Sequence, residues 1–256
     1  MRIFVLPKDF KGSTHHRVTG KDAHYLSRVL RLKEGDSFTG RDVKGSLWNL
    51  TLESISKSNC TLTCEPAETE PLALTDALPA FKGPFPEIHL YQAICKGKKM
   101  DQIIRQATEL GVKRIIPVSS AYCVADFSGK EQEKTTRYQT IVKEALQQSG
   151  SPVVTEIASP LSIGQVAQDW AARGTALVFH QVETGKQESL SSILHDSQDS
   201  PVALLVGAEG GFSNQEVSLL IEQGFHPVLL KTNILRAETA AIAAVAIVLH
   251  LVIDNV

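Results

Sequence analysis

The order of apolar and amphipathic segments after residue 87 constrains the fold more than any other feature of this sequence. Apolar runs of strand length alternate there with amphipathic stretches of helix length, and this order is typical of α/β domains whose helices connect parallel strands. The strands are expected at residues 88–94, 114–118, 153–157, 176–179, 202–206 and 227–230. We therefore predict an α/β domain with a mainly parallel sheet over residues 88–256.

The first 65 residues follow a different pattern. Trp48, Leu50 and Leu52 alternate with polar residues, which indicates a strand with one buried face, and a second strand is expected at residues 61–64. These features predict a small antiparallel barrel. The next stretch, residues 66–87, contains five of the eleven prolines and indicates a linker. The predicted organisation is a barrel over residues 1–70, a linker over 71–87 and the α/β domain over 88–256.

One stretch of the predicted barrel, DAHYLSRVLRLKEGD, has a helical pattern instead. Leu26, Val29 and Leu30 share one face of the expected helix, while Arg28 and Arg31 point toward solvent. Basic side chains on a short rigid helix are suited to contact phosphates.

The charge of the chain is unevenly distributed. A net charge of −2 argues against a uniformly basic surface for nucleic acid. Residues 1–35, however, carry eight Lys and Arg against three acids, and residues 95–114 carry six against two. Solvated surface lysines are the alternative explanation for either segment alone. Together the two segments favour a polyanionic partner.

The cysteines and the apolar segments bear on metal binding and location. Cys60, Cys64, Cys95 and Cys123 lack the spacing of a zinc site, so no metal is expected and a reduced, cytoplasmic protein is favoured. The N-terminal apolar run is too short for a signal peptide. The run at residues 240–253 is shorter than the roughly 18 to 20 apolar residues of a membrane span. We expect a buried core helix there and no membrane.

A glycine-rich turn at residues 207–212 follows the expected strand 202–206 and contains one acid, Glu209. Backbone N–H groups of such a turn approach a ligand closely. The spacing of its glycines and the residues after them differ from those of P-loops and of dinucleotide-binding turns, which disfavours nucleoside triphosphates and NAD. Ser213 and Glu216 form a capping-box pattern, so a helix is expected directly after the turn.

Two charged residues, Arg236 and Glu238, stand at the start of the last apolar helix. In a structural interpretation, Glu238 offsets the helix dipole, Thr239 caps the helix, and Arg236 pairs with Glu238 or Glu209. In a functional interpretation, the guanidinium beside a glycine-lined pocket holds a phosphate or orients a base.

Two segments that occur in this order carry a family resemblance: VGAEGGFSNQEV at residues 206–217 and ILRAETAAIAA at 234–244. They closely resemble the RsmE family of SPOUT-superfamily methyltransferases, which methylate N3 of a uridine in small-subunit ribosomal RNA. Nearly the whole chain supports the resemblance through further segments, AHYLSRVLRLKEGD, KGKKMDQIIRQATELGVKRIIPV and EALQQSG.

The resemblance implies a PUA-like β-barrel that binds RNA, followed by a SPOUT-type α/β domain with a C-terminal trefoil knot. It implies S-adenosylmethionine as methyl donor, 16S ribosomal RNA within the small ribosomal subunit as substrate, and a homodimer whose interface forms the active site. It assigns cofactor binding to Phe179, His180, Val206, Gly207, Glu209, Gly210, Gly211, Leu229, Leu230, Ile234, Leu235, Arg236, Thr239 and Ala240.

Arg236 is the predicted catalytic residue, which orients the target base or stabilises its developing negative charge. Glu209 is a candidate general base, and the alternative is that it shapes the glycine turn through hydrogen bonds to backbone N–H groups. The predicted RNA-binding residues are Arg2, Arg28, Arg31, Lys96, Lys98 and Lys99.

The sequence departs from the family pattern at three places. Ala208 replaces a proline, Lys231 replaces a glycine, and Ser120-Ala121-Tyr122 replaces Ser-Glu-Arg. Two other functions stay open at this point. One is a SPOUT methyltransferase that acts on tRNA, and the other is a non-catalytic RNA-binding or ribosome-assembly protein. The intact segment from Arg236 to Thr239 speaks against the second.

Overall fold

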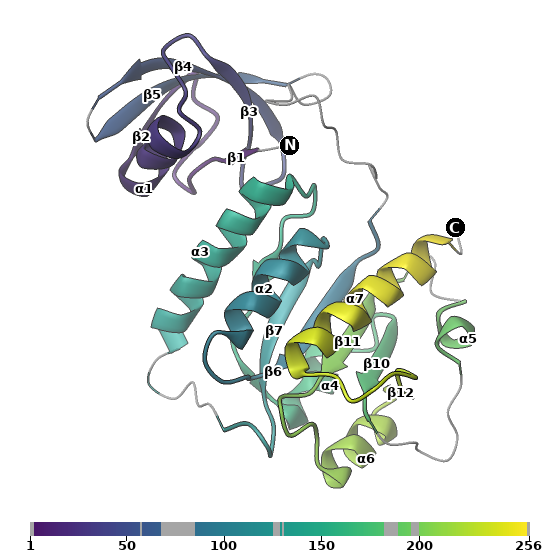
Figure 1. Ribbon diagram of the computed structural model, residues 1–256. Helices are drawn as coiled ribbons and strands as arrows, with labels where there is room; N and C mark the ends of the chain where they lie inside the picture. The colour runs from purple at the N-terminus through teal and green to yellow at the C-terminus, as the bar shows by residue number, and fades with distance from the viewer. Residues whose placement is uncertain are drawn as a thin grey trace. The chain divides into compact units, whose positions relative to one another are not determined.

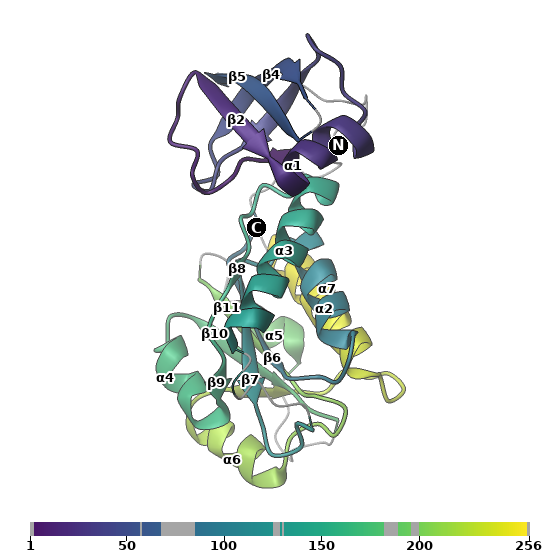
Figure 2. The same ribbon diagram turned by 90° about the vertical axis from the view of Figure 1, so that its left-hand side faces the viewer.

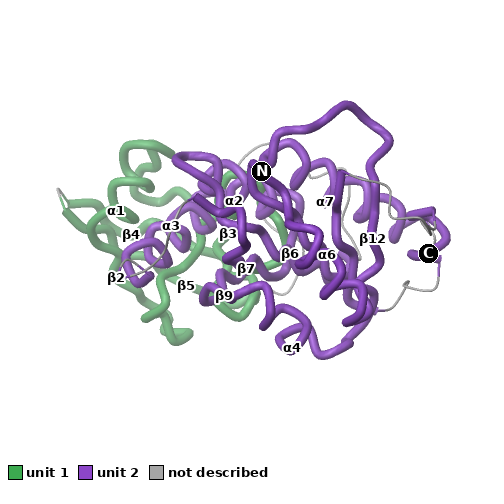
Figure 3. The backbone as a smooth tube through the Cα atoms, turned by 90° about the horizontal axis from the view of Figure 1, so that it is seen from below, with its two compact units in different colours: residues 1–82, 146–154 green, residues 83–145, 155–256 purple. Residues whose placement is uncertain are grey.

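The computed structural model describes residues 3–56, 58–67, 85–124, 129, 131–181, 189–195 and 200–254. The chain forms two compact units, residues 1–82 with 146–154, and residues 83–145 with 155–256 (Figure 3). Arg2 and residues 68–84, which include most of the predicted linker, lie outside the described residues.

The first unit contains a five-stranded sheet. Its strands lie in the order β1 (Phe4–Val5), β3 (Ser37–Arg41), β4 (Leu47–Ile55), β5 (Asn59–Pro66) and β2 (His15–Thr19). Every neighbouring pair is antiparallel except β1 and β3, which are parallel. Leu50 and Leu52 of β4 are fully buried with Leu62 of β5, as the alternating pattern predicts. We predicted an antiparallel arrangement, but the observed sheet is mixed because β1 and β3 are parallel.

The helical stretch of this unit differs from the prediction. A short helix α1 (Gly20–His24) continues into a π-helical turn η1 (Tyr25–Val29), in which the Leu30 N–H donates to the Tyr25 carbonyl at 2.9 Å. The wider π turn changes the helical register, so Leu26 is fully buried but Val29 is 51% exposed. The predicted inward position of Val29 is therefore wrong. Arg31 follows the turn with a φ of 55°, so it is not on the helix either.

The second unit is built on a sheet in which all neighbouring strands are parallel, as predicted. The strand order is β12-β10-β11-β6-β7-β8, and β9 also pairs with β7. The bounds are β6 Ile88–Ala93, β7 Arg114–Ser119, β8 Glu156–Ile157, β9 Leu161–Ser162, β10 Thr175–Phe179, β11 Val202–Val206 and β12 His226–Val228. Residues 153–155 do not join β8, and β12 ends two residues before its predicted end.

Helices cover both faces of this sheet. The helices α2, α3 and α7 lie side by side on one face, and α4 lies on the other (Figures 1 and 2). The helical bounds are α2 Lys99–Glu109, α3 Glu131–Ser149, a 3₁₀ turn Ile163–Gln165, α4 Val166–Trp170, α5 Leu190–Leu194, α6 Asn214–Glu222 and α7 Ala237–Asp254. The parallel strands place the turns after β10, β11 and β12 at one end of the sheet.

The last helix, α7, packs on the sheet with one face. Ala241, Ala244, Val245 and Val248 are fully buried, as expected of a core helix. Its other face keeps apolar side chains that are partly exposed, among them Ile247. By length and composition alone, α7 is the one helix in the described part of the chain that is apolar enough to span a membrane.

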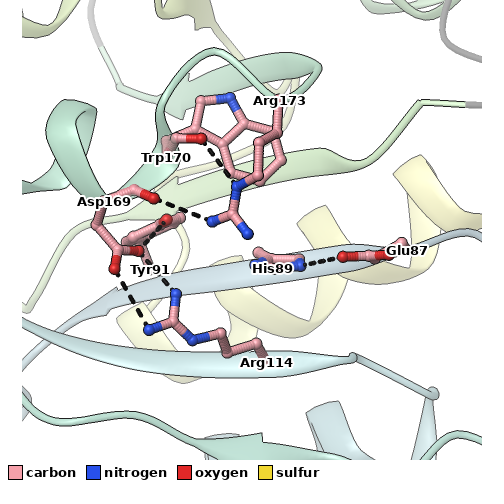
Figure 4. A network of polar contacts seen from close by, with 7 residues as sticks. All are labelled: Glu87, His89, Tyr91, Arg114, Asp169, Trp170 and Arg173. Atoms are coloured by element: carbon pink, nitrogen blue, oxygen red, sulfur yellow. Dashed lines mark hydrogen bonds and ion pairs between the residues drawn. The ribbon is translucent and has the colours of Figure 1, made fainter.

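A polar cluster joins the amino ends of β6 and β7 to α4 (Figure 4). Asp169 accepts a hydrogen bond from the Tyr91 hydroxyl at 2.6 Å and two from Arg114, at 2.8 and 3.3 Å. Arg173 donates to the Asp169 carbonyl and lies 5.0 Å from the ring centroid of Trp170. The cluster fixes the end of α4 to β6 and β7.

The pKa of Asp169 ties this cluster to the pH dependence of stability. Burial disfavours the charged carboxylate, but the hydrogen bonds from Tyr91 and Arg114 outweigh burial and lower the pKa. Asp169 therefore stabilises the fold above its unfolded-state pKa of about 4, and this contribution is lost as the pH falls through the lower folded-state pKa. Nearby, burial lowers the pKa of His89, although its Nε2 lies 2.7 Å from Glu87.

We expect Asp169→Ala to lower the free energy of unfolding by about 2–3 kcal/mol, because it leaves Arg114 and the Tyr91 hydroxyl without their acceptor. Urea unfolding at pH 7 measures this loss. Asp254→Ala is the matched control, since it removes an exposed pair with His250 and should cost at most about 0.5 kcal/mol. Equal stabilities of the two variants would contradict the prediction.

Candidate functional site

A cavity of about 360 Å³ opens at the carboxyl ends of β10, β11 and β12, where ligands bind in sheets of this kind. Its walls come from residues within the segments 179–181, 206–211 and 228–240, together with Lys99 at the start of α2. The lining residues are Lys99, Phe179, His180, Gln181, Val206, Gly207, Ala208, Glu209, Gly211, Val228, Leu229, Leu230, Thr232, Asn233, Ile234, Leu235, Arg236, Ala237 and Ala240. Segments far apart in the sequence thus form one pocket.

Most of the residues predicted for cofactor binding line this cavity, but Gly210 and Thr239 do not. Lys99, which we predicted to bind RNA, does line it. Six further lining residues were not predicted, although each lies within two positions of a predicted residue: Gln181, Ala208, Val228, Thr232, Asn233 and Ala237. Lys99 lies more than 100 positions from the glycine turn, so only the tertiary structure places it there.

The glycine turn doubles back on itself. Gly207 and Gly211 approach so closely that a Cβ atom at Gly207 would lie 2.9 Å from the Gly211 Cα. The Gly211 N–H donates to the Ala208 carbonyl at 2.9 Å, and Gly211 has a φ of 69°, which favours glycine. A Cβ at Gly210 would instead lie 2.8 Å from the Cβ of Tyr122. A side chain at position 210 would therefore collide with the loop after β7, and Gly210 does not line the cavity.

The predicted capping box at the start of α6 is confirmed. Ser213 Oγ accepts from the Glu216 N–H at 3.3 Å, and Glu216 Oε2 accepts from the Ser213 N–H at 2.8 Å. The other carboxylate oxygen, Oε1, accepts from the Ala121 N–H at 2.7 Å. The buried Glu216 therefore joins the loop after β7 to the end of the glycine turn.

The carboxylate of Glu209 has partners in the turn before α2 and at the first residue of α2. It accepts a hydrogen bond from Lys99 Nζ at 2.8 Å and one from the Lys96 N–H at 3.2 Å. Burial disfavours the carboxylate, but the hydrogen bond from Lys99 and the backbone N–H groups outweigh it and lower the pKa of Glu209. Glu209 in turn raises the pKa of Lys99 through the same hydrogen bond. A carboxylate stabilised in this way is a weak base, and its contacts hold the turn in place.

Arg236 directly precedes α7 and lines the cavity with an exposed guanidinium. Within the described residues it makes no ion pair, so the pairing with Glu238 or Glu209 does not occur. Glu238 lies in the first turn of α7, and its buried Oε2 has no hydrogen-bond partner among the described residues. Thr239 is inside the helix and exposed, so it does not cap it. Arg236 is thus an exposed cation in the pocket wall, without an ion-pair partner among the described residues.

The remaining cavity walls combine apolar and polar groups. Leu229, Leu230 and Leu235 supply aliphatic surface. His180 follows β10 and donates its backbone N–H to the Val228 carbonyl at 3.0 Å. Burial lowers the pKa of the His180 imidazole, which is therefore neutral at neutral pH.

Gln92, a buried side chain that contacts the glycine turn, was not identified from the sequence. Gln92 on β6 is fully buried, and its Nε2 lies 3.2 Å from the Gly207 carbonyl and 3.4 Å from that of Val206. These contacts orient the backbone where β11 enters the turn. The signal in the sequence was a polar residue within a mostly apolar strand, which does not by itself distinguish a functional role, since His89 of the same strand is also polar and buried.

The predicted RNA-binding residues fall in both units. Arg28 and Arg31 are exposed in the first unit, and Lys96 and Lys98 are exposed in the turn before α2 of the second. Lys99 is turned toward Glu209. Lys231, which replaces a family glycine, is exposed and does not line the cavity. Within the described residues, no group of three or more His, Cys, Asp or Glu side chains is arranged to hold a metal ion.

The fold and the pocket define an RNA methyltransferase. Residues 82–249 match the family described as RNA methyltransferase domain, and residues 18–64 match the family described as RNA methyltransferase PUA domain. The chain is 31% identical to the ribosomal RNA small subunit methyltransferase E of Synechocystis over 96% of its own length and 76% of that protein. It is 30% identical to that of Rickettsia conorii, over 96% and 93%. The chain belongs to the ribosomal RNA small subunit methyltransferase E family, as the sequence resemblance predicted.

Solved structures of relatives carry the cofactor. The ribosomal RNA small subunit methyltransferase E of Neisseria gonorrhoeae, bound to S-adenosylmethionine, is similar with a TM-score of 0.81 and 28% identity over 98% of both chains. A Legionella pneumophila methyltransferase in complex with the same cofactor has a TM-score of 0.82 and 25% identity over 97% of both chains.

Proposed function

We propose that this protein uses S-adenosylmethionine to methylate N3 of a uridine in 16S ribosomal RNA. The observation that carries the proposal is the pocket at the carboxyl ends of β10, β11 and β12, which is lined by the glycine turn and by Arg236. Its volume is in the range of small-molecule sites. The family membership and the cofactor in two structural relatives agree with this use of the pocket.

The residues of the pocket fit S-adenosylmethionine. Gly207 and Gly211 line the cavity without side chains, which lets a ligand approach the main chain, and the leucines at positions 229, 230 and 235 offer aliphatic surface to an adenine ring. When bound, the cofactor supplies an electrophilic methyl group on a sulfonium. The neutral His180 avoids repulsion with that positive charge.

The protein's own part in the reaction is to position the uridine and stabilise charge. Loss of the N3 proton leaves negative charge on the uracil ring, and the guanidinium of Arg236 stabilises it or orients the base. Two contacts hold the glycine turn in shape: Gln92 donates to the Gly207 carbonyl, and Lys99 donates to Glu209.

The proposal includes the domain roles. Residues 1–70 bind RNA, residues 71–87 link, and residues 88–256 catalyse. The exposed Arg28, Arg31, Lys96 and Lys98 neutralise phosphates, and Arg2, outside the described residues, joins them. The substrate is the RNA within the small ribosomal subunit, which places the protein in the cytoplasm.

We further propose a trefoil knot and a homodimer. The chain leaves the edge strand β12 and returns to the middle of the sheet as α7, and its connecting segment lines the same pocket as the turn after β11. This return path agrees with a knotted segment. Apolar side chains on the outer face of α7 and the 87% exposed Ile234 at the pocket agree with a partner subunit that covers them.

The test of the proposed function is the methylation state of 16S ribosomal RNA in cells that lack the gene. We expect one uridine to lose a single methyl group, detected by mass mapping and restored by the wild-type gene. A methyl group lost from tRNA instead would move the substrate to tRNA. Unchanged methylation of both RNAs would favour a non-catalytic RNA-binding protein and contradict the proposal.

A further inference from the structure

Tyr122 is an exposed aromatic residue beside the glycine turn, and the proposed function does not involve it. Tyr122 is 51% exposed, and it is the one aromatic residue among the large exposed hydrophobic residues of the described chain. Its ring makes no hydrogen bond or ring contact with the described residues. Tyrosine is enriched at surfaces that bind a partner, because its ring is apolar and its hydroxyl is polar.

The backbone of Tyr122 is nevertheless held in place. The preceding Ala121 N–H donates to the buried Glu216 at 2.7 Å, and the Cys123 N–H donates to the Ser120 carbonyl at 3.0 Å. The Cβ of Tyr122 packs against Gly210, where no other residue leaves enough space. The ring is therefore presented from a fixed position on the outer side of the glycine turn, at a low entropic cost for binding.

Exposed basic residues lie in a loop at the same end of the sheet as this ring. The strand order β11-β6-β7 brings the turn after β6, which carries Lys96 and Lys98, to the same end of the sheet as the glycine turn and the loop of Tyr122. The Lys96 N–H contacts Glu209, the neighbour of Gly210, so the three loops meet. Cations that neutralise phosphates beside an aromatic ring that stacks on a base form the usual surface for single-stranded nucleic acid.

We propose that Tyr122 stacks on an unpaired base of the substrate RNA next to the methylated uridine, and so contributes to recognition of the substrate. This role rests on the proposed function, since it needs RNA at the pocket. Stacking uses the π face of the ring and not its hydroxyl, which gives the proposal a sharp test.

The test measures methylation of small ribosomal subunits by Tyr122→Ala and Tyr122→Phe, with Val124→Ala as control because Val124 is 71% exposed in the same loop. We expect Tyr122→Ala to raise KM for the RNA at least about fivefold, while KM for S-adenosylmethionine stays unchanged. Tyr122→Phe and Val124→Ala should behave as wild type.

Three results would overturn the proposal. An unchanged KM for RNA in Tyr122→Ala would remove Tyr122 from the substrate surface. A parallel loss of cofactor affinity would make Tyr122 a support of the glycine turn only. A Tyr122→Phe variant as weak as Tyr122→Ala would assign the effect to the hydroxyl.

A direct binding assay separates this proposal from the proposed function. Fluorescence anisotropy with a labelled single-stranded ribosomal RNA fragment needs no methyl transfer. If the wild-type protein does not methylate the subunit, the proposed function fails, but weaker RNA binding by Tyr122→Ala than by Val124→Ala still supports stacking. Equal binding by these two variants contradicts it.

Discussion

Arg236→Ala should lower kcat for RNA methylation by about 100-fold or more, with a much smaller change in RNA affinity. The reason is that its guanidinium has no ion-pair partner among the described residues and lines the pocket, so its charge is available to the base as negative charge develops. Removing a donor that acts at this stage typically costs 10²–10³ in rate. Single-turnover methylation of small ribosomal subunits measures the effect.

Lys231→Ala is the matched control for this prediction. Lys231 is a cation in the same segment, but it is exposed and outside the pocket. We expect it to retain the wild-type kcat, which excludes a general effect of charge. If Arg236→Ala methylates at the native rate, Arg236 is only a surface charge before α7, and the catalytic assignment fails.

Gly207→Val should reduce affinity for S-adenosylmethionine by more than about 100-fold. A Cβ atom at this position would lie 2.9 Å from the Gly211 Cα, and the branched valine adds two methyl groups there. The turn cannot move away easily, because Gln92 holds the Gly207 carbonyl and the Gly211 N–H is bonded to Ala208. Isothermal titration calorimetry of the purified variant measures the loss.

The control for the cofactor prediction is Gly164→Ala. Gly164 has open space around its Cα and no positive φ, so its variant should bind the cofactor as wild type does. Circular dichroism of both variants shows whether the fold survives. A folded Gly207→Val protein with native affinity would place the cofactor away from the glycine turn.

Features that depend on neighbours in the chain were predictable from the sequence. The alternation of apolar runs and helices predicted the parallel sheet, because each strand must bury both faces between helices. The capping box at Ser213 and Glu216 was equally local, since it needs only two side chains three positions apart. The two motifs at residues 206–217 and 234–244 predicted the family.

The local pattern misled where a backbone irregularity intervened. An ideal helical repeat places Val29 with Leu26, but the π turn at residues 25–29 changes the number of residues per turn and exposes Val29. Periodicity alone does not reveal such a turn, because the sequence is consistent with either repeat.

The sequence by itself determined the fold class, the position of the glycine turn and the family, since these follow from short-range patterns and motifs. Only the tertiary structure decided what each charge and glycine contacts. Glu209 pairs with Lys99 and not with Arg236. Gly210 packs against Tyr122 and does not line the cavity. These contacts join residues far apart in the chain, and the order β11-β6-β7 of the folded sheet brings them together. Contacts of this kind exist only once parallel strands distant in sequence have paired.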